Sequence, residues 1–158
     1  MYKIFILLFF IPGISTIIDF VIFLTTGRKQ FRGPYGFILD LINLLGFPYF
    51  YLATGMPFDN NANILIDEPY RGVTFIVIAL CLIGYFALNY LHRHLQNPVQ
   101  IIAIASLGIG IFINVAMIYQ QEAIFSFFNV PIILLFIMQI VEKSNALIQA
   151  NKPSTLTD

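Results

Sequence analysis

Two aspartates inside long apolar segments are the residues of this chain most suited to chemistry. Asp19 lies in an apolar segment of about 4–24, and Asp40 lies in a second one of about 37–54. An ionised aspartate at the centre of a membrane helix costs about 2.5 to 3.5 kcal/mol on insertion scales, and such residues mark proton relays, ion pathways or buried ion pairs. Both lie within a few helical turns of the basic connector at 28–32, so we expect them to approach each other or this connector.

Helical spacing brings further polar side chains to the same end of the predicted helices. Asp40 and Asn43 share one helical face, and Tyr85, Asn89 and His92 follow one side of the third apolar segment. These residues could serve a proton-coupled carrier, a cation site or a small membrane enzyme. We therefore predict a polar cavity, open to the cytoplasm, that is lined by Asp19, Asp40, Asn43, Asn89 and His92.

A structural role for the same residues is the alternative interpretation. Asp19 and Asp40 would then pair with connector arginines, while Asn and Ser side chains would form interhelical hydrogen bonds worth about 0.6 kcal/mol each. In the fourth apolar segment, small and polar residues at helical spacing also predict a close approach between helices. They are Ala103, Ser106, Gly110 and Asn114.

The search for cofactor and metal motifs gives no usable candidate. His92 and His94 would point about 200° apart on a helix, so they could not bind one ion together. Cys81 is the single cysteine, which excludes an internal disulfide and a cysteine-based zinc site and makes it a packing residue. We find no nucleophile with a base, no His-x-x-x-His pair and no usable glycine-rich phosphate loop, and we expect no cofactor.

One polar connector partly matches a calcium-binding loop. Its first, third, fifth and ninth positions hold Asp59, Asn61, Asn63 and Asp67. The sixth position requires glycine for a sharp turn and holds Ile64, while the twelfth requires a bidentate glutamate and holds Tyr70. We interpret the segment as an Asn-rich polar loop, with weak external cation binding left open.

Composition places the whole chain in a lipid environment. Hydrophobic residues make up 59% of the sequence and charged residues 10%, whereas soluble domains carry about 25% charged residues. The formal net charge is zero, and no basic patch of the kind that nucleic acid requires is present. The expected partners are therefore the lipid bilayer and a second copy of the chain or another membrane protein, and not nucleic acid.

Segment length then predicts the fold. A hydrocarbon core about 30 Å thick requires about 20 helical residues, because each residue of a helix rises 1.5 Å. Five segments meet this requirement, at about 4–24, 37–54, 73–91, 99–119 and 123–141. We predict an all-α integral membrane helical bundle with five transmembrane helices, a single domain over 1–143, and a largely disordered cytoplasmic tail over 144–158.

Basic residues predict the orientation, since short loops rich in Lys and Arg stay in the cytoplasm. The first connector, the third connector and the tail hold six of them: Arg28, Lys29, Arg32, Arg93, Lys143 and Lys152. The opposite side holds two, Lys3 and Arg71. We therefore predict an external N-terminus and a cytoplasmic C-terminus, in a bacterial cytoplasmic membrane.

These features favour an accessory or interaction protein that acts through helix packing in the bilayer. The first alternative is a carrier or channel subunit that uses Asp19 and Asp40 for proton or cation coupling. A membrane enzyme acting on lipid is less favoured, because no catalytic residue set stands out in the sequence.

Overall fold

The computed structural model describes residues 2–46, 70–120 and 123–151, and this part of the chain is helical without a β-strand. Five α-helices form it: α1 (Tyr2–Thr26), α2 (Gly33–Leu41), α4 (Tyr70–Phe86), α5 (Asn97–Gln120) and α6 (Ala123–Ala150). Two π-helical turns, η1 (Ile42–Gly46) and η2 (Ala87–Leu91), continue α2 and α4, and the short 3₁₀ turn η3 (His92–His94) follows η2. The all-α prediction is confirmed for these residues.

Four of the helices in the described residues largely coincide with a predicted apolar segment, whereas α2 and η1 together overlap the predicted segment 37–54 only over 37–46. The largest differences lie at two ends, since α2 begins at Gly33 and α6 continues to Ala150, into the segment predicted as a tail. The end of the second apolar segment at 47–54, the calcium-like connector and the terminal residues 152–158 lie outside the described residues.

Two helices of the described residues are long and apolar enough to cross a membrane by length and composition alone. They contain the stretches Asn97–Ala116 and Asn129–Ala150. Two further apolar stretches, Phe10–Thr26 and Ile76–Leu91, are shorter.

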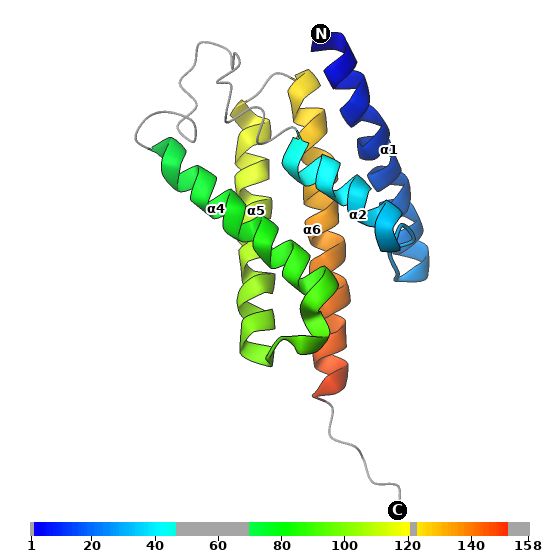
Figure 1. The fold of residues 1–158 in the computed structure, drawn as a ribbon, viewed down its shortest axis with the longest axis vertical. Coiled ribbons are helices and arrows are strands. Elements are labelled where there is room, and N and C mark those ends of the chain that lie inside the picture. The colour runs from blue at the N-terminus through cyan, green and yellow to red at the C-terminus, as the bar shows by residue number, and fades with distance from the viewer. Residues whose placement is uncertain (1, 47–69, 121–122, 152–158) are drawn as a thin grey trace, which may run out of the picture.

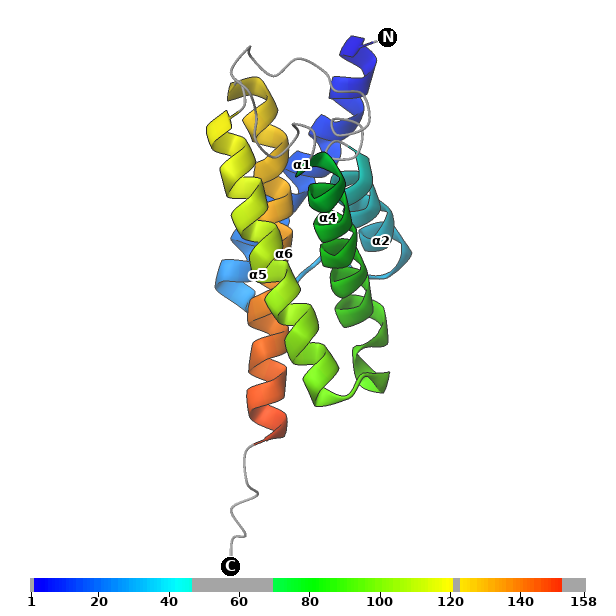
Figure 2. The same cartoon turned by 90° about the vertical axis from the view of Figure 1, so that its left-hand side faces the viewer.

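The helices are arranged around α6, which packs against α5 and α1, while α4 packs against α5. Figures 1 and 2 show α2 and α4 together on one side of α5 and α6. The C-terminal ends of α1, α4 and α6 all point toward the end of the molecule opposite the N-terminus (Figure 1). The two segments that carry Asp19 and Asp40 therefore meet near this end through the connector between α1 and α2.

Small residues in the interior of the bundle allow α4, α5 and α6 to approach closely. A Cβ atom at Gly84 of α4 would collide with the Ser106 hydroxyl of α5, and one at Gly110 would collide with the Phe136 ring of α6. Cys81 is buried at the same place, and its thiol donates to the carbonyl oxygen of Ser106 at 3.0 Å. The small residues predicted on the fourth segment, with Gly84 opposite, thus form a close-packed seam between α4, α5 and α6.

Candidate functional site

The connector between α1 and α2 turns back into the bundle. Gly27 adopts a left-handed conformation with φ of 67°, and its N–H donates to the Phe23 carbonyl at 2.8 Å, which ends α1. Gly36 of α2 lies so close to the connector that a Cβ atom there would overlap the Phe31 carbonyl. This path carries the side chain of Lys29 inward, where it is buried.

Lys29 forms a buried ion pair with Asp40 of α2. Its Nζ donates to the two carboxylate oxygens of Asp40 at 2.7 and 2.5 Å and to the hydroxyl oxygen of Tyr85 at 3.0 Å. The Tyr85 hydroxyl in turn donates to Asp40 Oδ2 at 2.8 Å. The three donors of the ammonium group therefore all have acceptors. We call Lys29, Asp40 and Tyr85 the charged cluster.

The charged cluster joins the connector to two helices that are far apart in the sequence. Tyr85 is completely buried at the end of α4, and its ring lies 6.0 Å from that of Phe136 in α6. Removing one member of a buried, hydrogen-bonded ion pair leaves the other charge uncompensated and typically costs about 3 to 5 kcal/mol. The charged cluster can therefore hold the connector, α2 and α4 in one arrangement.

Asp19 contacts the same connector from α1. Its Oδ1 atom accepts the backbone N–H of Gln30 at 2.6 Å, and the side chain is only 1% exposed. Asp40 is 2% exposed. Both acids approach the basic connector, as expected, but Asp40 pairs with Lys29 rather than with an arginine and Asp19 binds the backbone.

Asn43 makes a separate contact between α1 and η1. Its Nδ2 atom donates to the Thr16 hydroxyl at 2.8 Å and to the Pro12 carbonyl at 3.2 Å. Both of these acceptors belong to α1. The two bonds are interhelical hydrogen bonds of the kind that the structural alternative predicts.

A polar pocket of about 270 Å³ lies on the outer side of the charged cluster. Its walls come from the α1–α2 connector, η2, η3 and α6, and its polar side chains are Lys29, Arg32, Asn89, Arg93, Glu142 and Lys143. Lys29 belongs both to this pocket and to the charged cluster. We call it the basic pocket.

Positive charge exceeds negative charge in the basic pocket. Glu142 is its one lining carboxylate, and it lies 3.1 Å from Arg32 and 3.9 Å from the buried Lys143. The positive charge of Lys29 is compensated by its ion pair with Asp40. Arg93 forms no ion pair with any of the described residues, so the basic pocket keeps a net positive charge.

The five predicted site residues do not all face one cavity. Asp19 accepts from the connector backbone and Asp40 pairs with Lys29, whereas Asn89 lines the basic pocket and Asn43 contacts α1. The side chain of His92 lies outside the described residues. No group of three His, Cys, Asp or Glu side chains that could hold a metal ion occurs within the described part of the chain.

Sequence reasoning missed the roles of Lys29, Glu142 and Lys143. Lys29 was visible only as one of three basic residues in the connector, and nothing in the spacing separates it from Arg28 and Arg32. Glu142 and Lys143 follow the end of the fifth predicted span, and they reach the basic pocket because α6 continues as a helix.

The chain matches no protein-family model, and searches of curated proteins and of solved structures returned no match.

Proposed function

We propose that this chain is an integral membrane protein with five spanning helices that acts as an accessory or interaction protein through helix packing. The observation that carries the proposal is the reversed distribution of polarity. Phe112 is 74% exposed and Ile102 69% exposed on α5, whereas Asp19 and Asp40 are almost completely buried. Large exposed apolar surfaces in soluble proteins are rare, and a bilayer provides the apolar solvent that they require.

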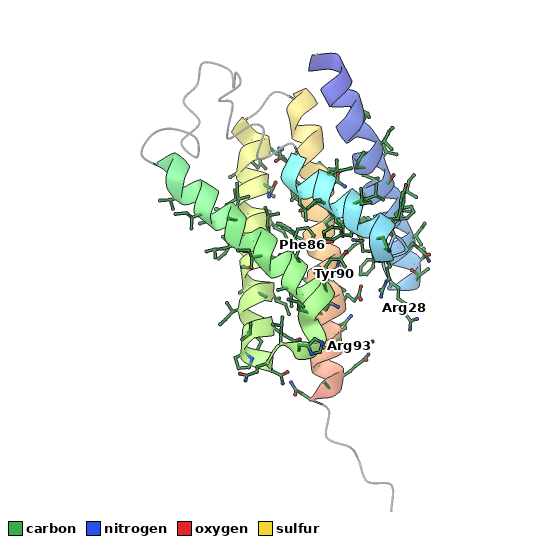
Figure 3. The ribbon with its side chains drawn as sticks, in the orientation of Figure 1. Arg28, Phe86, Tyr90 and Arg93 are labelled. Carbon is green, nitrogen blue, oxygen red and sulfur yellow. The ribbon has the colours of Figure 1, made fainter. Side chains whose placement is uncertain are left out.

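The proposed orientation has the N-terminus outside and the C-terminus in the cytoplasm of a bacterial cell. Its support is the position of the basic residues. Arg28 and Arg93 lie in the half of the molecule that contains the C-terminal end of α6 (Figure 3), and the basic pocket brings Lys29, Arg32 and Lys143 to the same half. Lys and Arg in short connectors favour the cytoplasmic side.

An interaction role is supported by how the buried acids are used. The charged cluster satisfies Asp40, and the connector backbone satisfies an oxygen of Asp19, so these groups stabilise the bundle itself. The exposed faces of α1 and α5 remain apolar, with Ile11, Ile18, Ile102 and Phe112 among their exposed residues. Such faces can contact lipid or a transmembrane helix of another protein.

Native mass spectrometry of the full chain in a mild detergent tests the interaction role. We expect a fixed stoichiometry, either with a second copy or with one other membrane protein. The charge-neutral variant Asp19→Asn should keep this stoichiometry, because Asn can still accept the Gln30 N–H through its carbonyl oxygen. A chain that is monomeric in detergent and in nanodiscs, without a protein partner, would contradict the interaction role.

A carrier or channel subunit is the second candidate, and one observation favours it. Lys29 connects the open basic pocket to the buried carboxylate of Asp40, so a proton or cation could reach an ionisable pair from one side. Liposomes that contain the purified chain and a pH-sensitive dye test this role. Proton flux that is present in the parent and absent in the folded Asp40→Asn variant would support the carrier or channel function and contradict the interaction role.

A further inference from the structure

An apolar groove lies next to the basic pocket and shares one lining residue with it. The groove has a volume of about 660 Å³ and lies between α2 and α4, with Phe37 and Leu41 on one side and Leu82, Ile83 and Phe86 on the other. Tyr90 of η2 lines both the groove and the basic pocket. The two hollows are therefore neighbours that share Tyr90 as a wall residue.

Aromatic rings form the wall at the junction. The Phe37 ring lies 5.5 Å from that of Phe86 and 5.3 Å from that of Tyr90, and the Phe86 and Tyr90 rings are stacked at 6.2 Å. In Figure 3, Phe86, Tyr90 and Arg93 follow one another toward the C-terminal end of the molecule. A tyrosine between an apolar and a charged region has the position that its ring and hydroxyl favour at a membrane interface.

The length and direction of the groove suit a lipid chain. Leu82 and Phe86 are separated by about 6 Å along the axis of α4 at 1.5 Å per residue, and Tyr90 lies about one π-helical turn further on. In the proposed orientation, α4 runs toward the cytoplasm, so the groove extends from the headgroup level at Tyr90 toward the middle of the bilayer at Leu82. The basic pocket then lies at the level of the cytoplasmic headgroups.

We propose that the basic pocket and the apolar groove together bind one anionic phospholipid, with its phosphate in the pocket and an acyl chain in the groove. This proposal rests on the membrane location proposed above. Arg93 and Lys143 provide positive charge for the phosphate, and Arg32 can exchange its exposed contact with Glu142 for one with the lipid. Basic pockets at the cytoplasmic ends of transmembrane helices have the charge that anionic headgroups require.

The test is native mass spectrometry of the full chain in detergent micelles that contain either phosphatidylglycerol or phosphatidylcholine. We expect one phosphatidylglycerol molecule to be retained at detergent and collision conditions that remove phosphatidylcholine. Equal retention of the two lipids would overturn the proposal. Failure of the chain to fractionate with membranes would instead overturn the proposed function, so the two failures are distinguishable.

Arg93→Gln is the variant for the headgroup. We expect phosphatidylglycerol binding to weaken about fivefold, which corresponds to the loss of one basic contact near an anionic headgroup. Arg28→Gln is the matched control, because Arg28 is an exposed basic residue of the α1–α2 connector that does not line the basic pocket. Equal losses for the two variants would show a nonspecific charge effect and overturn the assigned pocket.

Two further measurements test the acyl-chain position. Ile83→Ser should weaken phosphatidylglycerol retention, whereas Ile109→Ser should not, since Ile109 is similarly exposed on α5 but lies away from the groove. Glycerol phosphate, which lacks acyl chains, should fail to displace the lipid at equal concentration. Displacement by glycerol phosphate, or equal effects of the two serine variants, would reduce the site to a phosphate pocket and overturn the phospholipid proposal.

Discussion

Two buried regions hold the helices together in different ways. The small-residue seam joins α4, α5 and α6 by close contact, and its tightest positions are Gly84 and Gly110. The charged cluster joins the α1–α2 connector to α2 and α4 through an ion pair that Tyr85 completes. The glycines of the seam stabilise the packing because they leave room for the neighbouring helix. In the charged cluster, each polar group instead needs the other two as hydrogen-bond or ion-pair partners.

This difference predicts different responses to substitution. A close-packed interface without an ion pair tolerates changes that keep side-chain volume and hydrogen bonds. A buried ion pair tolerates simultaneous removal of both charges far better than removal of one. Single and paired variants in the two regions therefore separate packing by shape from packing by charge.

The largest effect is expected for Lys29→Met, which removes the ammonium group and leaves Asp40 buried and unpaired. We expect the unfolding free energy in mixed micelles to fall by about 3 to 5 kcal/mol. The double variant with Asp40→Leu is the control, and it should recover most of this loss because no uncompensated charge remains. A double variant as unstable as Lys29→Met would show that the ion pair is not the source of the effect.

Tyr85→Phe should have the next largest effect. It keeps the ring against Phe136 but removes the hydroxyl that donates to Asp40 and accepts from Lys29. Hydrogen bonds to charged groups are worth about 1.5 to 3 kcal/mol, and we expect a loss of stability of that size in denaturant titrations. Tyr35→Phe is the matched control, since Tyr35 is exposed. Equal stabilities of the Tyr85→Phe variant and the parent would show that the Tyr85 hydroxyl does not stabilise the charged cluster.

The helices and the approach of the acids to the basic connector could be predicted from the sequence. Long apolar segments predict helices, two of which are long and apolar enough to cross a membrane among the described residues, and Asp19 and Asp40 are the polar exceptions within such segments. The choice of Lys29 as the partner depends on the left-handed turn at Gly27 and on the close approach at Gly36. These are tertiary features, and helical periodicity contains no information about them.

Gly110→Ala tests the seam. The added methyl group would collide with the Phe136 ring, and overpacking of this kind costs about 1 to 3 kcal/mol. Gly108→Ala is the matched control in the same helix, because a Cβ atom there meets no atom within 4 Å and alanine is the better helix former. Thermal unfolding in detergent should place the Gly110 variant below the parent and the Gly108 variant at or above it. The reverse order would contradict close packing at the seam.

The smallest effect is expected for Asn43→Leu, which removes the hydrogen bonds from η1 to Thr16 and Pro12 of α1. Interhelical hydrogen bonds in membrane proteins average about 0.6 kcal/mol, so denaturant titration should show a loss near that size. The matched variant Thr16→Val removes one of the two acceptors, and its effect should not add to that of Asn43→Leu. A loss comparable to that of Lys29→Met would place Asn43 within the charged cluster.

The central proposal, a five-span bundle with an external N-terminus, is tested most directly by cysteine labelling in intact cells. In a Cys81→Ala background, single cysteines replace Asn61 in the second connector and Gln96 in the third. A membrane-impermeant maleimide should label the cysteine at 61 without cell lysis and the one at 96 only after lysis. Labelling of both positions in intact cells, labelling of the opposite position, or recovery of the chain in the soluble fraction would contradict the proposal.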